Sequence, residues 1–330
     1  MITVTLYTKK ACSLCKKALS DLKALRAKIP HNLALVDIET DPALKAAYGE
    51  RVPVLQAGPY TLSAPFSRKQ AQATLAAAHD RQEQLASDPG FQARKARSEL
   101  LTPTDRLNSW WSQRYLVVLN LIIFLYVGLP FLAPMLMKAG YPQAARPIYG
   151  LYGAVCHQLG FRSWFLFGEQ AMYPRATAGL QGVETFQAAT GIDESDPRNL
   201  LAARDFIGNE ELGYKVAFCQ RDIAIYGAML MFGLLFAVTG RRIRPLPWYL
   251  WLLIGIAPVA LDGFSQLLSQ FPGFSWWEYR ESTPLLRTLT GALFGFTTAW
   301  FGFPLLEESI AETRVVVASK KARLAGKKKP

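Results

Sequence analysis

Two cysteines near the start of the chain have the spacing of a reactive dithiol. The stretch TKKACSLCKKAL, residues 8–19, places Cys12 and Cys15 in a C-x-x-C motif. An alternating run, ITVTLYT, precedes the motif, and KKALSDLKALRAK follows it with leucines at helical spacing. The cysteines therefore open a helix directly after a strand, where free backbone N–H groups stabilise a thiolate and lower a cysteine pKa.

The C-x-x-C motif predicts thiol–disulfide exchange. Cys12, the more exposed first cysteine, would attack as a thiolate, and Cys15, one helical turn later, would resolve the mixed disulfide. Positive potential nearby comes from lysines, namely Lys9, Lys10, Lys16 and Lys17. Two other interpretations stay open, half of a zinc site or two inert cysteines. Zinc needs four ligands, and His31 and His79 show no paired ligand spacing.

The elements that would position this motif follow in a regular order. LALVDI predicts a second strand, a short helix is expected around Pro42–Tyr48, and RVPVLQAGPYTLS predicts two further strands joined by a turn. Ser67 offers an N-cap for a helix through Ala78. The expected order is β-α-β-α-β-β-α, with the dithiol between the first strand and the first helix.

This order, with C-x-x-C after the first strand and Val-Pro before the third, resembles glutaredoxin-like members of the thioredoxin fold. The resemblance covers residues 1–80 and implies an α/β thioredoxin-like domain. It also implies that Pro53 is a cis-proline that faces the cysteine pair and offers backbone to a bound thiol or peptide. The partners it implies are a thiol reductant, glutathione or another thiol donor, and a protein disulfide substrate.

The rest of the chain is strongly apolar and predicts membrane helices. Four stretches are long enough to cross a hydrocarbon core of about 30 Å: residues 115–137, 223–240, 246–268 and 288–306. We therefore expect an all-α transmembrane domain of four spans over residues 114–310, with the lipid bilayer as its partner. A basic helical linker, residues 81–113, would join it to the first domain.

The distribution of basic residues predicts the orientation in the membrane. Lysine and arginine precede the first span, separate the second from the third and fill a basic tail, residues 311–330. The positive-inside rule assigns all three segments to the cytoplasm, so both termini would be cytoplasmic in a multi-pass protein of the bacterial cytoplasmic (inner) membrane. The net charge of +12 then reflects topology, and no nucleic-acid partner is expected. The connection 138–218 and the segment 271–283 would lie outside.

A second set of chemically distinctive residues lies in the membrane half. The pattern is C-H-Q, then R-S, then C-x-R-D-x-x-I-Y, then D-G. Counting along the spans places the following side chains toward the outer face, where they could form one site: Cys156, His157, Arg162, Cys219, Asp222, Tyr226, Asp262, Gln266 and Arg287. Ionisable groups near hydrocarbon need partners, and Arg162 and Arg287 are the expected partners of Asp222 and Asp262.

This pattern is similar to an uncharacterised family of predicted bacterial membrane proteins, over about residues 140–305. The residues themselves leave several interpretations open. Cys156 and Cys219 would form a structural disulfide or a working redox couple, or would stay free in a satisfied polar core. Alternatively, Cys156, His157, Cys219 and Asp222 would bind a metal such as zinc, which suits thiolate and imidazole ligands.

Two smaller features complete the prediction. Gly291 and Gly295, with G-x-x-x-G spacing, would let the last span approach a neighbouring helix closely. The polar stretch 181–213 would form a solvated cover over the helices. Because no Walker, Rossmann, G-x-S-x-G or H-E-x-x-H motif occurs, the predicted function is a membrane-tethered thiol–disulfide oxidoreductase. The alternative is a membrane domain that does the main work, as a metal-assisted enzyme or small-solute permease, with an accessory redox domain.

Overall fold

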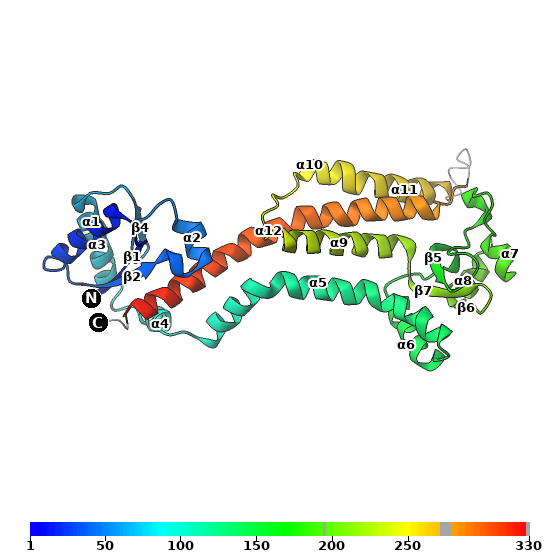
Figure 1. Ribbon diagram of the computed structural model, residues 1–330, viewed down its shortest axis with the longest axis horizontal. Helices are drawn as coiled ribbons and strands as arrows, with labels where there is room; N and C mark the ends of the chain where they lie inside the picture. Colours follow the sequence, from blue (N-terminus) through cyan, green and yellow to red (C-terminus); the bar gives the residue numbers. More distant parts are fainter. Residues whose placement is uncertain (194–195, 271–278, 328–330) are drawn as a thin grey trace. The chain divides into compact units, whose positions relative to one another are not determined.

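The computed structural model describes residues 1–193, 196–270 and 279–327 (Figure 1). The chain divides into two compact units: the first comprises Met1–Tyr115 with Glu308–Pro330, and the second comprises Leu116–Glu307. The predicted linker and the predicted basic tail thus both belong to the first unit. Part of the predicted outer segment 271–283 and the last three residues of the tail lie outside the described residues.

The first unit is built on a four-stranded sheet. Its strands are β1 (Ile2–Thr8), β2 (His31–Asp37), β3 (Val54–Ala57) and β4 (Tyr60–Ser63). Their order is β2-β1-β3-β4, with β1 and β2 parallel and the other pairs antiparallel. The parallel pair is joined through α1 (Ser13–Leu25), as a parallel connection requires. The expected thioredoxin-like fold is confirmed.

One face of the sheet packs against two helices. Ile2, Val4 and Leu6 of β1 are buried in one cluster with residues of α1 and of α3 (Arg68–Gln84). On α1 the buried positions Ala18, Leu22 and Leu25 recur at helical spacing and so form one apolar stripe. Ser67 caps α3 as predicted, in a capping box with Gln70.

The other face of the sheet carries a second cluster. Tyr7, next to Leu6 on β1, points to this side because successive strand residues alternate. It packs with Val36, Val54 and residues of η1 (Ile38–Thr40) and α2 (Pro42–Tyr48). Ala318, near the end of α12 (Pro284–Lys327), belongs to the same cluster. The basic tail is therefore helical as far as Lys327, and its Ala318 forms part of the first unit's core.

Polar contacts tie the tail to the segment expected to be a linker. This segment contains α4 (Pro89–Ser98) and the start of α5 (Pro103–Lys138). Lys320 Nζ lies 2.6 Å from Asp105 Oδ2, and Arg323 donates to the Ser98 carbonyl at 2.9 Å. Several of the basic residues that predicted orientation thus also make specific contacts within this unit.

Among the described residues, four helices are long and apolar enough to cross a membrane, as predicted. They are α5, α9 (Gln220–Val238), the continuous helix Trp248–Ser269 and α12. The third consists of α10 (Trp248–Leu250), a π-helical segment η5 (Trp251–Ile256) and α11 (Ala257–Ser269). Apolar side chains such as Val117, Leu121 and Leu253 are more than half exposed along these helices. Exposed apolar surface of this kind fits contact with lipid.

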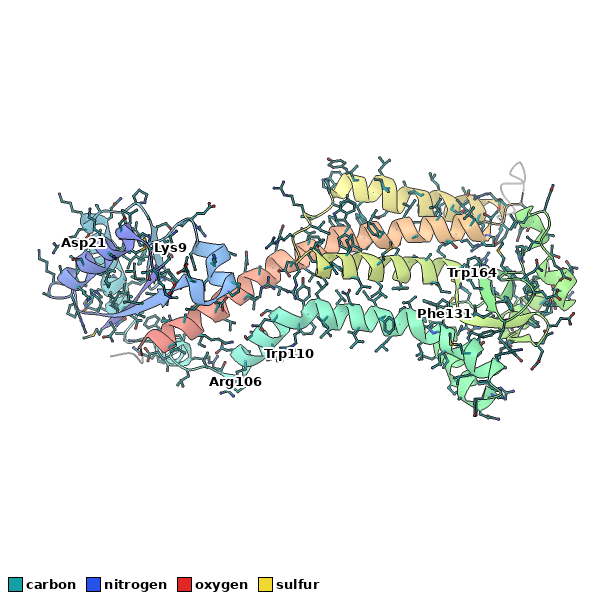
Figure 2. The ribbon with its side chains drawn as sticks, in the orientation of Figure 1. Lys9, Asp21, Arg106, Trp110, Phe131 and Trp164 are labelled. Atoms are coloured by element: carbon teal, nitrogen blue, oxygen red, sulfur yellow. A yellow bond between two sulfur atoms is a disulfide. The ribbon has the colours of Figure 1, made fainter. Side chains whose placement is uncertain are left out.

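The cap, defined here as residues 139–219, connects α5 to α9. Its elements are α6 (Pro142–Gly153), η2 (Gly160–Arg162), β5 (Ser163–Leu166), η3 (Ala176–Ala178), α7 (Phe186–Thr190), η4 (Pro197–Asn199), α8 (Leu200–Asp205), β6 (Gly208–Asn209) and β7 (Gly213–Cys219). The strands form an antiparallel sheet in the order β5-β7-β6, with Trp164 on β5 (Figure 2). An all-α domain was expected, and this small sheet is an addition to it.

The cap has an aromatic core of its own. Phe161, Phe165, Tyr173 and Phe186 are buried together, with the rings of Phe165 and Tyr173 edge to face at 5.1 Å. Phe186 belongs to the polar stretch that was expected to be a solvated cover and is fully buried. Apolar side chains of this stretch therefore pack against the rest of the cap and hold the stretch in place.

Close packing between α9 and α12 depends on two glycines, as their spacing predicted. A Cβ atom built on Gly295 would overlap the Ile225 carbonyl oxygen, and one built on Gly291 would lie 2.7 Å from the Arg221 carbonyl oxygen. These atoms are backbone and cannot rotate away. Small residues at a helix interface permit this approach in membranes.

We expect Gly295→Ala to destabilise the protein, because the added methyl must push two membrane helices apart. Overpacking of this kind costs about 1–3 kcal/mol, which should appear as a lower thermal unfolding midpoint in detergent. Gly302→Ala is the matched control, because a Cβ atom added there, on the same helix, would meet no atom within 4 Å. Equal midpoints for the two variants would contradict the packing role.

Candidate functional site

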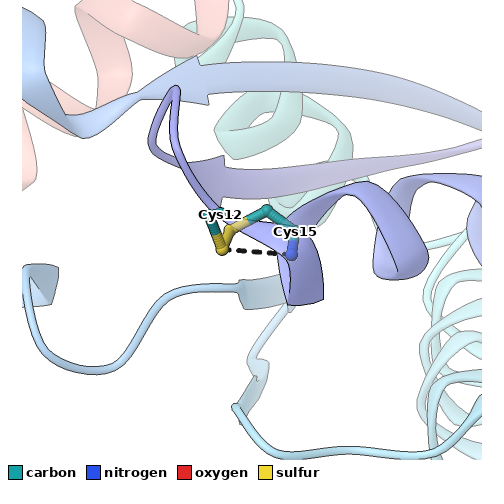
Figure 3. Close-up of a disulfide and its surroundings, with 2 residues drawn as sticks. All are labelled: Cys12 and Cys15. Atoms are coloured by element: carbon teal, nitrogen blue, oxygen red, sulfur yellow. Dashed lines mark hydrogen bonds between the residues drawn. A yellow bond between two sulfur atoms is a disulfide. The ribbon is translucent and has the colours of Figure 1, made fainter.

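The dithiol lies at the start of α1, where the sequence placed it. Cys12 is the N-cap residue, with extended backbone at φ −132° and ψ 106°. Its Sγ accepts a hydrogen bond from the Cys15 backbone N–H at 3.1 Å, and the two sulfurs are joined in a disulfide (Figure 3). In the reduced protein the same N–H would stabilise a thiolate at Cys12.

Cys12 is more exposed than Cys15, as thiol–disulfide exchange through Cys12 requires. Cys15 is buried, whereas Cys12 is half-buried and has the exposed Leu14 beside it. The lysines of the motif are exposed, and Lys9 stands in the loop between β1 and α1 (Figure 2). An incoming disulfide can therefore approach Cys12 more readily than Cys15.

A cis-proline directly precedes strand β3. The Val52–Pro53 peptide bond is cis, as the resemblance implied, and Pro53 is buried. Val52 and Val54 pack in the same cluster as Cys15, so this turn lies in the surroundings of the disulfide. The Pro53 carbonyl accepts a hydrogen bond from the Ala64 N–H at 3.0 Å, which holds the turn against the end of β4.

Tyr7 is a neighbour of the dithiol that sequence reasoning did not identify. It is buried in the cluster that contains Cys15, stacks on Tyr48 with ring centroids 4.4 Å apart and donates to Gln56 at 3.1 Å. Burial raises the pKa of its phenol. Tyr7 is the last residue but one of β1. The sequence pattern predicted only that it belongs to a strand and did not indicate that it lies near the dithiol.

Only three of the four candidate metal ligands in the membrane half lie close together. Cys156, Cys219 and Asp222 offer ligand atoms that all lie within 4.8 Å of one another. Cys219 is the N-cap residue of α9, and its thiol donates to Asp222 Oδ2 at 2.7 Å. Cys156 and Cys219 are free thiols in this structure. His157 is exposed and does not join the three, so the expected four-ligand set is reduced to three.

The two thiols have opposite tendencies to ionise. The interaction with the neighbouring Cys219 thiol lowers the pKa of Cys156, and the interaction with Cys156, followed by burial, raises the pKa of Cys219 well above its ordinary value. The nearby carboxylate of Asp222 also opposes ionisation of Cys219. Within this pair Cys156 is therefore the cysteine that ionises first.

A network of hydrogen bonds positions these thiols. Gln158, with a left-handed φ of 51°, donates to the carbonyls of Tyr149 at 2.9 Å and Ala217 at 2.7 Å, which fastens the C-H-Q turn to β7. Ser163 pairs with Cys219 between β5 and β7. Buried Gln220 then donates to the Ser163 carbonyl at 3.1 Å. The motif residues Gln158 and Ser163 are thus structural.

Lys215 holds the same region from inside the cap. Its side chain is buried, and its Nζ donates to the carbonyls of Gln158, at 2.9 Å, and Arg204. It lines a small cavity of about 180 Å³ with Tyr149 and Asp205. Burial lowers the pKa of Lys215 to about 7. The sequence showed only a lysine in an apolar run and no reason to expect its burial.

Aromatic side chains pack around the two thiols. Cys156 is buried in one cluster with Tyr152 and Phe218, and Tyr226 packs against it. The rings of Phe218 and Tyr226 stack with centroids 5.9 Å apart, and Tyr126 meets Tyr226 edge to face at 4.7 Å. Tyr226, a predicted site residue, therefore contributes to packing around the thiols.

The remaining candidates belong to a separate charged network. Asp262 is buried, pairs with Arg221, accepts from Arg280 at 2.9 Å and accepts from Ser282 at 2.8 Å. Its helix neighbour Gln266 accepts from Arg287 at 3.3 Å. Burial of both residues confirms that Asp262 and Gln266 share one face of α11.

The expected partners of the aspartates were wrong. Arg162 and Arg287 bind Glu281 instead, with Arg162 at 3.0 and 3.1 Å in a two-pronged contact, and Arg175 approaches Glu281 at 3.5 Å. Asp222 forms no ion pair within the described residues and contacts Cys219. Glu281 lies in the predicted outer segment 271–283 and was not among the expected site residues, although a carboxylate so near a span end is a signal for pairing.

Comparisons with known proteins divide the chain in the same way. Residues 3–79 match the family "Glutaredoxin-like domain (DUF836)", and residues 210–301 match "Predicted membrane protein (DUF2085)". The chain is 25% identical over 205 residues to "Uncharacterized protein MJ1492" of Methanocaldococcus jannaschii, covering 59% of this chain and 94% of that protein. It is also 38% identical to the X. campestris structural genomics target XcR50, covering 22% of this chain and 96% of that chain, with a TM-score of 0.20.

We expect Glu281→Gln to destabilise the second unit strongly. Removal of this buried charge leaves three arginines without their shared carboxylate, and breaking a buried pair costs about 3–5 kcal/mol. The thermal midpoint in detergent should fall by far more than in Glu169→Gln, which neutralises an exposed carboxylate of the cap. A fall no larger than that of the control would mean that the network adds little stability.

Lys215 makes stability depend on pH in one direction. Its pKa is about 7 in the folded protein and higher in the unfolded chain, so the unfolded state binds more protons above pH 7. Folding stability should therefore rise as pH increases from 7 toward 10, by up to about 1.4 kcal/mol per pH unit. Lys215→Met should remove this slope from a plot of thermal midpoint against pH; an unchanged slope would assign it to other groups.

Proposed function

Because the chain joins a glutaredoxin-like domain to a predicted membrane-protein domain, we propose that it is a membrane-anchored thiol–disulfide oxidoreductase. The observation that supports this most directly is the Cys12–Cys15 disulfide at the N-terminus of α1, with the first cysteine the more exposed. A dithiol in this position alternates between a nucleophilic thiolate and a disulfide without any change of fold.

The proposed reaction uses only thiols and disulfides. The Cys12 thiolate attacks one sulfur of a substrate disulfide, forming a mixed disulfide and releasing the other substrate sulfur as a thiolate. The Cys15 thiolate then attacks Cys12 Sγ, which releases the second substrate thiolate and leaves the Cys12–Cys15 disulfide. Two donor thiols, from glutathione or a protein dithiol, return the two electrons and regenerate the reduced pair. The cis peptide at Pro53 would present backbone to the bound thiol.

Location is part of the proposal. Basic segments flank the spans on the side that carries both termini, and the positive-inside rule places that side in the cytoplasm of a bacterial inner membrane. The reducing conditions there would return Cys12 and Cys15 to the reduced form that starts the reaction. The membrane domain would then hold this chemistry at the bilayer, near membrane-bound disulfide substrates.

A second candidate function resides in the membrane domain itself. Its support is that the ligand atoms of Cys156, Cys219 and Asp222 lie close together and that the same unit contains a buried charged network. Hydrophobic packing of the helices requires neither feature. In this alternative the membrane domain does the main work and the dithiol domain is accessory. The two functions separate experimentally, because the first depends on Cys12 and the second does not.

We expect Cys12→Ser to lower reduction of a standard disulfide substrate, in the presence of glutathione, by at least about 100-fold, because serine cannot form the attacking thiolate. Cys15→Ser should instead accumulate a mixed disulfide at Cys12, visible by mass spectrometry. Ser13→Ala, an exposed change between the two cysteines, is the control and should retain activity. Unchanged turnover in purified Cys12→Ser protein would refute the proposed reaction.

A further inference from the structure

We propose that Cys156, Cys219 and Asp222 bind a divalent cation of the zinc class at the cap end of α9. The three donors come from two segments, the turn after α6 and the start of α9, and their ligand atoms lie within 4.8 Å of one another. Two sulfurs and one carboxylate oxygen form a set that suits zinc, a borderline-soft ion. This inference does not rest on the proposed function.

The distances between the three ligand atoms would suit a bound ion after small side-chain rotations. A tetrahedral zinc ion with ordinary bond lengths separates its ligand atoms by about 3.5–3.8 Å. Cys219 Sγ and Asp222 Oδ2 are now 2.7 Å apart, so they must separate by about 1 Å. Asp222 lies in the first turn of α9, where its side chain can change rotamer without moving the backbone.

The surroundings hold the donors in place before any ion binds. Gln158 fastens the turn that carries Cys156 to β7, and Ser163 pairs with Cys219 at the other side. Cys156 is also fixed through its backbone N–H, which donates to the Tyr152 carbonyl at 2.9 Å. Such support for the ligands is what a metal site requires from its outer contacts.

Charge supplies the second argument. Asp262 and Glu281 are each neutralised by arginines, but Asp222 has no ion pair within the described residues, although it starts a membrane helix. An ionised carboxylate there is costly without a cation. Two thiolates and one carboxylate carry three negative charges, of which a divalent ion would neutralise two.

The number of ligands indicates the kind of site. Structural zinc sites have four protein ligands, whereas sites with three keep one position for water or a substrate. His157, the remaining nearby candidate in the sequence, is exposed and outside the group. The proposed site therefore belongs to the open class, with an aromatic floor of Tyr152, Phe218 and Tyr226.

The test uses the full-length Cys12→Ser/Cys15→Ser protein, purified in detergent with a non-thiol reductant, so that the dithiol cannot bind the metal. We expect one Zn²⁺ per chain by elemental analysis after dialysis. Co²⁺ should give the visible and near-ultraviolet bands of tetrahedral thiolate coordination. In the same background, Cys156→Ser, Cys219→Ser and Asp222→Asn should each lower Zn²⁺ affinity by at least about 10-fold, and His157→Ala should retain it.

A second measurement needs no ligand variant, in case one fails to fold. Zn²⁺ should raise the thermal midpoint of this protein and protect Cys156 and Cys219 from maleimide, and a chelator should reverse both effects. Less than half an equivalent of metal, unprotected cysteines, or metal retained in all three ligand variants would overturn the proposal. A Cys156–Cys219 disulfide that persists in the reductant would overturn it as well.

Discussion

Carboxylates buried in a membrane domain require cations, and two of them, one within α11 and one before α12, hold the second unit together. Asp262 and Glu281 are almost fully buried, and arginines from the cap, α9, the segment before α12 and α12 itself surround them. Each carboxylate is shared, so loss of one leaves several guanidinium groups uncompensated. Their pairing therefore draws together segments that lie far apart in the sequence.

The cap depends on this constraint. Its short strands β5, β6 and β7 would be marginal alone, since a small sheet needs an apolar face to pack against. The aromatic core around Phe165 and Phe186 supplies that face, and Arg162, at the end of η2, joins it to Glu281. Cys219 ends β7 and caps α9, so the position of one thiol follows from both the sheet and the helix.

The two cysteine pairs have different physical surroundings and so different chemistry. Cys12 and Cys15 share one helical turn, and the first is partly exposed, which favours exchange with an incoming disulfide. Cys156 and Cys219 come from separate elements, lie above aromatic rings and face a carboxylate.

The sequence by itself determined the features that depend on local order along the chain. Alternation and helical spacing predicted the dithiol domain, Ser67 as a cap, four apolar helices and a close approach of the last helix through Gly291 and Gly295, because each depends on residues a few positions apart. That the neighbouring helix is α9 came from the structure. It also identified Cys12 and Cys15, since C-x-x-C after a strand already implies a helix N-terminus.

Only the tertiary structure decided which distant polar groups meet. Arg162 and Arg287 bind Glu281 and not the aspartates, His157 is exposed and lies outside the group of thiols, and Lys215 is buried. Ion pairs between segments depend on how helices and loops pack in three dimensions, and several arginines were equally available to each carboxylate. Pairing of this kind has no periodicity in the sequence, so the partners become known only when the fold brings them within a few ångströms.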